Sequence, residues 1–206
     1  MNRSKQASSV YDKIAEPYAK EFSNPSEYIE EFLALLPKNT KILDVGCGVG
    51  VDAGFMMSED FEIIGIDMSK EMLNIARQKF PRVDFRQQDI RKLDFPPNSF
   101  DGILASCSLI HIPKKEVPTL LKKFHQILKK NCAIYIALQG GKSEELFIDE
   151  PFKPDEKLFL NIISFDEIKN LLVKNGFSIV KKYEREPKSK GELNYTKLYV
   201  IAKKQS

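Results

Sequence analysis

The sequence predicts a single α/β domain with a mostly parallel sheet covered by helices on both faces. Short β-branched runs alternate with amphipathic helical stripes along the 206 residues, which is typical of parallel strands joined by helical crossovers. The stretches Ile63–Ile66 and Ala133–Leu138 are nearly continuous in apolar residues, as expected for strands that are buried on both faces. The candidate strands are Lys41–Val45, Glu62–Ile66, Val83–Gln87, Gly102–Ala105, Ala133–Leu138, Phe177–Lys182 and Thr196–Ala202.

The ends of several elements can also be predicted. Asn24–Glu27 offers an N-cap followed by a proline at the first helical position, and it predicts a helix that stops at Pro37. Ser69 is the predicted N-cap of the helix after the second strand. Asn175-Gly176 predicts a left-handed C-cap for the last helix. The polar loop Glu184–Asn194 separates the final two strands and allows an antiparallel hairpin at the end of the sheet.

Composition narrows the functional classes. The formal net charge of +3, with scattered lysines, disfavours nucleic acid as a partner. Three widely spaced cysteines favour a reducing compartment, and two histidines without close Cys or carboxylate groupings disfavour a metal site. Met1–Val10 lacks the apolar core of a signal peptide, and no apolar run has the length of a membrane span. We therefore expect a cytoplasmic protein without a metal, and either a monomer or a homodimer fits.

A glycine-rich turn follows the first strand. Gly46, Gly48 and Gly50 alternate with other residues, which lets the backbone approach a ligand closely, and the next helix points its amino end at the same place. A dinucleotide-binding motif would have its third glycine at position 51, which is Val51. Asp44, two residues before the turn, would repel a pyrophosphate but could bind the ammonium of an amino-acid ligand.

Acidic residues also end the next two strands. Asp67 lies seventeen residues after Gly50, where a carboxylate can accept hydrogen bonds from both ribose hydroxyls. Asp89 could accept a hydrogen bond from an exocyclic amino group, with the backbone of Ile90 meeting the neighbouring ring nitrogen. For Asp89 a solvated loop carboxylate is nearly as good an interpretation. Because the carboxyl ends of parallel strands share one edge of the sheet, all three acidic residues are expected to gather there.

With these motifs in this order, the sequence resembles the class I S-adenosylmethionine-dependent methyltransferases of the small-molecule type. The match begins at Asp44–Gly50 and continues at 65–69, 88–90, 99–104 and 165–177, so it covers essentially the whole chain. Residues 129–132 depart from the Pro-Gly-Gly turn of many relatives. The resemblance implies a Rossmann-like three-layer sandwich with a seven-stranded, mostly parallel sheet of order 3-2-1-4-5-7-6, whose last strand is antiparallel.

The resemblance also implies cofactor contacts. Gly46, Cys47 and Gly48 would lie against the methionine portion of S-adenosylmethionine, and Asp67 would hold the ribose. Met68 would pack on the adenine, whose edge Asp89 and Ile90 would read. Ser106 would offer a backbone carbonyl near the methionyl amine. Cys47 and Met68 are equally compatible with buried core positions.

The segment Ser106–His111, after the fourth strand, should face the methyl acceptor. It lacks the Asp/Asn-Pro-Pro-Tyr/Phe signature of amide and exocyclic nitrogen methylation, and Cys107 lacks the preceding proline of a cytosine C5 nucleophile. His111 is the candidate general base because it titrates near neutral pH. An equally good interpretation is a histidine that hydrogen-bonds the backbone and shapes the site.

Two segments are predicted to cover the site of this single domain, 1–206. Residues 1–37 resemble an N-terminal helical lid, in which Tyr11 and Tyr18 would close over the cofactor and meet its carboxylate. Packing by an amphipathic helix is the alternative for these rings. Residues 139–160 form the second expected lid, on the acceptor side. The predicted function is methyl transfer to a small molecule; RNA or protein methylation, and a cofactor-binding module without turnover, are the alternatives.

Overall fold

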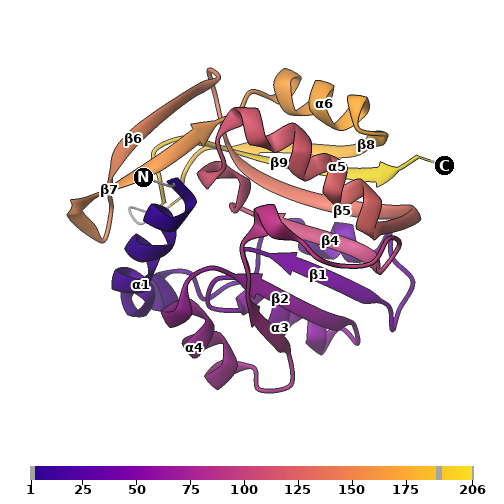
Figure 1. The fold of residues 1–206 in the computed structure, drawn as a ribbon, viewed down its shortest axis with the longest axis horizontal. Coiled ribbons are helices and arrows are strands. Elements are labelled where there is room, and N and C mark those ends of the chain that lie inside the picture. Colours follow the sequence, from indigo (N-terminus) through magenta and orange to yellow (C-terminus); the bar gives the residue numbers. More distant parts are fainter. Residues whose placement is uncertain (1–2, 189–191, 206) are drawn as a thin grey trace.

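The computed structural model describes residues 3–188 and 192–205. Its main sheet has seven strands in the order β3-β2-β1-β4-β5-β9-β8 (Figure 1). β9 pairs antiparallel with β5 and β8, and the pairs among the other strands are parallel. The predicted order and the antiparallel last strand are confirmed. The strands are β1 (Lys41–Val45), β2 (Glu62–Asp67), β3 (Asp84–Gln87), β4 (Phe100–Ser106), β5 (Leu128–Gly140), β8 (Phe177–Arg185) and β9 (Thr196–Lys204).

Helices cover both faces of this sheet, which completes the three layers (Figure 1). One face packs against α5 (Val117–Ile127) and α6 (Phe165–Lys174) in a large apolar cluster. The opposite face packs against α2 (Ile29–Leu33), α3 (Val51–Ser58) and α4 (Lys70–Lys79) in a second cluster. Short 3₁₀ turns follow β3 and β4; they are η1 (Ile90–Lys92), η2 (Leu109–His111) and η3 (Lys114–Glu116).

Two of the predicted helix ends are confirmed and two are wrong, because the helix predicted to stop at Pro37 already ends at Leu33. The Ser69 side chain accepts from the Met72 N–H and caps α4, and Gly176 adopts φ +81° after α6. The helix predicted to open at Asn24–Glu27 begins only at Ile29, because Ser26 turns away to bind a side chain of another element. Its N–H and hydroxyl donate to the Asp52 carboxylate at 2.6 and 2.7 Å. Tertiary contacts therefore override the local capping signal.

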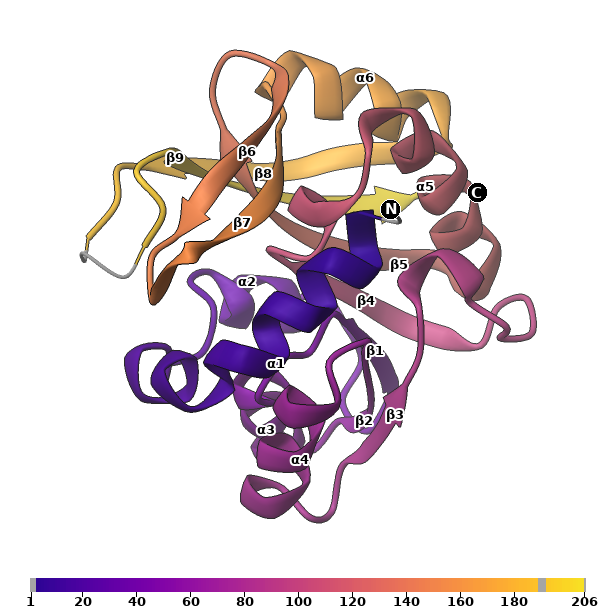
Figure 2. The same cartoon turned by 60° about the vertical axis from the view of Figure 1, so that its left-hand side comes forward.

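The segment after β5 forms a β-hairpin. β6 (Glu144–Glu150) pairs antiparallel with β7 (Lys153–Ile162) in a separate two-stranded sheet. Strand β6 is exposed or half-buried up to the buried Glu150, whereas the residues from Leu158 to Ile162 in β7 are buried. The hairpin leans over the carboxyl edge of the main sheet, next to α1 (Arg3–Glu21) (Figure 2).

Helix α1 lies across that same edge, between the hairpin and α4 (Figure 2). The Asp12 carboxylate accepts from the Ser69 hydroxyl and the Glu71 N–H at the start of α4, at 2.6 and 3.1 Å. On its other side, the Gln6 side-chain amide donates to the Lys157 carbonyl of β7 at 2.8 Å. These contacts hold α1 in place over the carboxyl ends of the parallel strands. No helix in the ranges that the structure describes is long and apolar enough to cross a membrane.

Candidate active site

The glycine-rich turn joins β1 to α3 with three left-handed glycines. Gly46, Gly48 and Gly50 have φ values of +74°, +51° and +80°. The N–H groups of Gly46 and Cys47 donate to the carbonyl of Ile66 in β2, at 2.8 and 3.0 Å, and so fix the turn against the neighbouring strand. A Cβ on Gly46 would meet the Ser108 Cβ at 2.5 Å, and one on Gly50 would meet the Phe85 ring at 2.7 Å. A Cβ on Gly48 would meet nothing within 4 Å, so the turn is open to a ligand there.

We predict that Gly48→Ala folds but loses affinity for S-adenosylhomocysteine, the product that S-adenosylmethionine leaves after methyl transfer. The left-handed backbone of an alanine at position 48 costs about 1 kcal/mol of unfolding free energy, and its methyl group enters the space where a ligand would approach. Denaturant unfolding and calorimetric titration measure the two effects. Gly50→Ala is the comparison: its Cβ meets Phe85, so its main loss should be in stability. Unchanged affinity in Gly48→Ala would contradict the prediction.

Asp44 lies in β1, two residues before the turn, and is 1% exposed. Its Oδ2 atom has no hydrogen-bond partner among the residues that the structure describes. Burial raises the pKa of this carboxyl well above its usual value, and the neighbouring carboxylates of Asp52 and Asp67 raise it further. A buried carboxylate without a donor is costly. The ammonium of a bound amino-acid ligand would supply both the missing donor and the missing charge.

Asp67 is at the carboxyl end of β2 and lines the smaller of two adjoining cavities. Its carboxylate accepts from the Gly48 N–H at 2.9 Å and from the Ser69 N–H at 2.8 Å. These bonds hold the turn and the start of α4 together. Because an ionised carboxylate has about four acceptor positions, Asp67 can still accept from a ligand hydroxyl. Burial raises its pKa, and the backbone bonds from Ser69 and Gly48 act in the opposite direction.

Asp89 has a different environment from the other two acidic residues. Its carboxylate pairs with the Arg91 guanidinium, at 2.6 Å for the shortest contact, and also accepts from the Arg91 N–H. Gln88 and Ile90, on either side of it, line the smaller cavity together with Met68. The contact of Asp89 with adenine stays a prediction. Met68 and Ile90 have apolar side chains and line the same cavity as Asp67, so a flat ring in that cavity could pack against them.

Two adjoining cavities lie at the carboxyl edge of the sheet, and the predicted site residues other than Asp89 line one or both of them. The smaller has a volume of about 120 Å³ and the larger about 430 Å³. Both are lined by Tyr11, Tyr18, Gly46, Gly48, Ser106 and Cys107. The larger also contains Asp44 and Cys47, and its size alone is typical of a small-molecule site. The Ser106 hydroxyl lies 2.7 Å from that of Ser26, so it helps to hold the α1–α2 connection over the cavity.

His111 connects three elements above the cavities. Its Nδ1 lies 2.9 Å from the carbonyl oxygen of Phe159 in β7, and its Nε2 lies 2.8 Å from the Tyr11 hydroxyl of α1. Because a carbonyl only accepts, Nδ1 carries the proton and Nε2 accepts from Tyr11. Burial lowers the pKa of His111 to about 4, although the bond to Phe159 opposes the shift. The imidazole is therefore neutral at pH 7, with both nitrogens engaged.

Tyr18 lies about two helical turns after Tyr11 on α1. The two rings pack edge to face, with their centroids 5.8 Å apart. Tyr18 also contacts Phe22 and, from the hairpin, Phe152. Its hydroxyl makes no hydrogen bond within residues 3–188 and 192–205, and burial raises its pKa. Tyr18 thus combines the two alternatives for these rings: it packs the α1–hairpin contact and leaves a donor in the cavity. Contact with the cofactor carboxylate stays a prediction.

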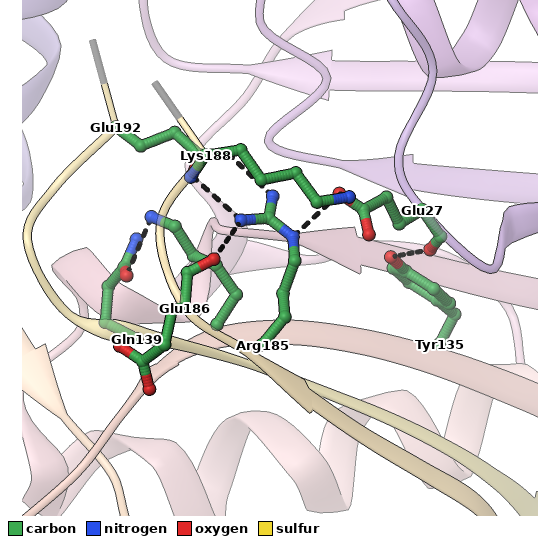
Figure 3. A network of polar contacts seen from close by, with 8 residues as sticks. Glu27, Tyr135, Gln139, Arg185, Glu186, Lys188 and Glu192 are labelled. Carbon is green, nitrogen blue, oxygen red and sulfur yellow. Dashed lines mark hydrogen bonds and ion pairs between the residues drawn. The ribbon is translucent and has the colours of Figure 1, made fainter. Parts of the chain in front are cut away.

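Sequence reasoning missed the residues on the far side of the larger cavity. Arg185 and Lys188, from the end of β8 and the loop after it, meet Glu27 and Glu192 there (Figure 3). Beside this network, Lys197 of β9 donates to the Gln139 side chain at 2.9 Å. The sequence of the loop after β8 indicates only a polar connection. The strands do carry a signal, because Gln139 and Lys197 are polar residues at the ends of apolar runs, at the edge of the sheet.

Residues 42–131 match the model of the methyltransferase domain family. The putative methyltransferase YqeM of Bacillus subtilis is 30% identical over 157 residues, which are 72% of this chain and 61% of that protein. The O-methyltransferase cnsE of Penicillium expansum is 31% identical over 68% of this chain and 52% of its own length. The chain thus spans about half to three-fifths of the length of these two relatives.

A solved structure, a protein from Methanosarcina mazei described as an S-adenosylmethionine-dependent methyltransferase, superposes with a TM-score of 0.77. It is 19% identical and the match covers 88% of this chain and 99% of that one, which shows a shared fold. The sheet order, the left-handed glycine turn and the acidic residues at the strand ends agree with this match. Residues 42–131 therefore match a methyltransferase domain, and the chain shares the fold of a solved S-adenosylmethionine-dependent methyltransferase.

Proposed function

We propose that this protein transfers the methyl group of S-adenosylmethionine to a small-molecule acceptor. The observation that carries the proposal is the buried Asp44 carboxylate, whose Oδ2 has no partner among the described residues and which lines the same cavity as the open turn at Gly48. An ammonium beside a carboxylate is what the amino-acid end of this cofactor would supply. Asp67, which can still accept from a ligand hydroxyl, suits the ribose, and the apolar side chains of Met68 and Ile90 suit the adenine.

The cofactor, when bound, supplies a methyl group on a positively charged sulfur. The chain has to hold the reactants in line and keep water out. Asp44 and the backbone around Gly46–Gly48 would orient the amino-acid end, and Asp67 would fix the ribose. The cover formed by α1 and the β6–β7 hairpin would enclose the reacting atoms, with Tyr11 and His111 fastening it.

The contacts of His111 favour positioning over proton abstraction. Its Nε2 lone pair already accepts from Tyr11, and its pKa of about 4 makes it a weak base at pH 7. The Tyr11–His111–Phe159 chain joins α1, η2 and β7, which are three elements around one cavity. Its proposed role is to set the cover in place. Under this role His111→Gln should keep S-adenosylhomocysteine binding, while turnover falls because the cover is loosened.

Relatives support an acceptor that is a small molecule. Besides the O-methyltransferase of Penicillium expansum, the curated relatives include phosphoethanolamine N-methyltransferases of Arabidopsis thaliana and Triticum aestivum. These proteins are named for an O-methylation and for a small phosphate-bearing amine. The larger cavity, at about 430 Å³, has room for an acceptor of that size class. RNA or protein methylation would call instead for an open, basic groove beside the cofactor.

Labelled methyl transfer tests the proposal. The purified chain is incubated with methyl-labelled S-adenosylmethionine and a metabolite pool, and products are identified by mass spectrometry. We expect label in one or a few low-molecular-weight products, and no product with Asp44→Asn. Label recovered in RNA or protein alone would overturn the small-molecule acceptor. Cofactor binding without transfer to any acceptor would instead indicate a binding module.

A further inference from the structure

The larger cavity is lined by a buried lysine that has no carboxylate partner among the residues that the structure describes. Lys197 of β9 stands opposite Gln139 of β5 in the antiparallel pair, and both side chains line the cavity. Lys197 is 7% exposed and Gln139 is 2% exposed. The Lys197 Nζ donates to the Gln139 Oε1 at 2.9 Å. Neither residue lies next to the glycine-rich turn, so they belong to the part of the cavity beyond the proposed cofactor site.

The two other cations that line this cavity in the described part of the chain, Arg185 and Lys188, are paired with carboxylates. Arg185 Nη2 lies 2.6 Å from Glu192 Oε1, and Arg185 Nε lies 2.7 Å from Glu27 Oε1 (Figure 3). Lys188 lies 2.9 Å from the same Glu27 oxygen. Glu192 is near enough to act on Lys197 through its charge, but its carboxylate is held by Arg185. Within residues 3–188 and 192–205, Lys197 forms no ion pair.

This arrangement leaves hydrogen-bond donors facing the cavity. An ammonium has three N–H groups, and Lys197 uses one of them on Gln139. The side-chain amide nitrogen of Gln139 donates to no group in the described ranges, while its oxygen is occupied by Lys197. Burial lowers the pKa of Lys197, which is the expected result of an ammonium without a counter-charge. An oxyanion in the cavity would accept from both side chains and supply that charge.

The Lys197–Gln139 pair is also near enough to the proposed cofactor site for one small molecule to reach from one to the other. Ala137, two residues before Gln139 on β5, lines the same cavity, and its carbonyl accepts from the Cys107 N–H at 3.0 Å, just past the end of β4. Two residues of extended strand span about 7 Å. A small molecule with an anionic group on Lys197 could thus reach the neighbourhood of Cys107 and Ser106, which also line the proposed cofactor site.

We propose that the methyl acceptor is a small organic oxyanion whose negatively charged oxygens are bound by Lys197 and Gln139. This inference rests on the proposed methyltransferase function and names its acceptor class. A carboxylate and a phosphate monoester share this chemistry. The acceptor atom would lie at the opposite end of the molecule from the anionic group, towards Ser106 and Cys107.

Probe binding to the protein saturated with S-adenosylhomocysteine tests the proposal. Benzoate and phenyl phosphate are the anionic probes, and benzamide and benzylamine are the neutral and cationic probes. Ligand-observed NMR titration gives each dissociation constant. We expect at least one anionic probe to bind about tenfold or more tighter than benzamide, which corresponds to about 1.4 kcal/mol. Tighter binding of benzoate would indicate a carboxylate site, and tighter binding of phenyl phosphate would indicate a phosphate site.

Variants assign the preference to Lys197. Lys197→Met should remove the preference for the anion, whereas Lys197→Arg should keep most of it because the positive charge remains. Lys174→Met, on an exposed position of α6 away from the cavity, is the matched control and should behave as the wild type. S-adenosylhomocysteine affinity and thermal unfolding report on the fold of each variant.

Three results would overturn the inference: no anionic preference in the wild type, tighter binding of benzylamine than of the anions, or an unchanged preference in Lys197→Met. Failure of the wild type to bind S-adenosylhomocysteine would count against the proposed function instead. The two failures are therefore read from different titrations.

Discussion

Replacing Asp44 with asparagine is expected to weaken cofactor binding roughly a hundredfold while leaving the free protein at least as stable. The carboxylate is 1% exposed and its Oδ2 lacks a partner, so in the cofactor-free protein it contributes desolvation cost and repulsion from Asp52 and Asp67. Removing the charge should raise the unfolding free energy by about 1 kcal/mol. Removing the partner of a buried ligand charge should cost about 3 kcal/mol of binding, or roughly a hundredfold in affinity.

Asp101→Asn is the matched control, because Asp101 is also a buried carboxylate, on the adjacent strand β4. It accepts from the Lys129 ammonium at 2.9 Å and from the Lys41 N–H at 3.1 Å, so its charge is compensated. This variant should lose stability and keep cofactor affinity. Calorimetric titration with S-adenosylhomocysteine and urea unfolding measure both quantities for both variants. Tight binding by Asp44→Asn would show that the carboxylate does not hold the cofactor.

Acid should destabilise the wild-type protein through His111. The pKa of His111 is about 4 in the folded protein and about 6.5 in the unfolded chain, so the unfolded chain binds more protons between these values. The unfolding free energy therefore falls as pH falls below about 6.5 and stops falling below about 4. Between pH 7 and pH 5 the expected loss from this residue is about 2 kcal/mol.

His111→Gln isolates that contribution. Other buried groups shift stability with pH in the opposite sense, because the raised pKa of Asp44 stabilises the protonated form, but they are common to both proteins. The difference between the wild type and His111→Gln should therefore shrink by about 2 kcal/mol between pH 7 and pH 5. His125→Gln, at a partly exposed histidine on α5, should change the slope far less. Parallel urea curves at the two pH values provide the measurement; identical slopes would mean that His111 is not buried as a neutral group.

The fold was largely predictable from local patterns. Apolar runs such as Lys41–Val45 have no stable alternative to a buried strand, and their alternation with helical stripes sets the parallel topology. Ser69 and Gly176 were predictable because a cap depends on its own residue and its immediate neighbours. The Asn24–Glu27 cap failed because Ser26 binds Asp52, a contact between residues 26 positions apart.

The site was predictable on the donor side and only partly on the acceptor side. Asp44, the turn glycines and Asp67 occupy ends of adjacent parallel strands, where chain order alone brings them together. The Tyr11–His111 bond joins residues 100 positions apart, and the Lys197–Gln139 bond joins residues 58 apart. Such contacts depend on how the cover and β9 pack, which no local pattern encodes. His111 lines the smaller cavity, and its role there stays a prediction; its buried, doubly bonded state could not be predicted without the structure.

Isothermal titration calorimetry of the wild-type protein with S-adenosylhomocysteine measures binding at the Asp44–Gly48 site. We expect one molecule to bind per chain, with a weaker affinity in Asp44→Asn and in Gly48→Ala and an unchanged affinity in Asp101→Asn. Absence of binding in well-folded wild-type protein, or equal binding by all four proteins, would contradict this expectation.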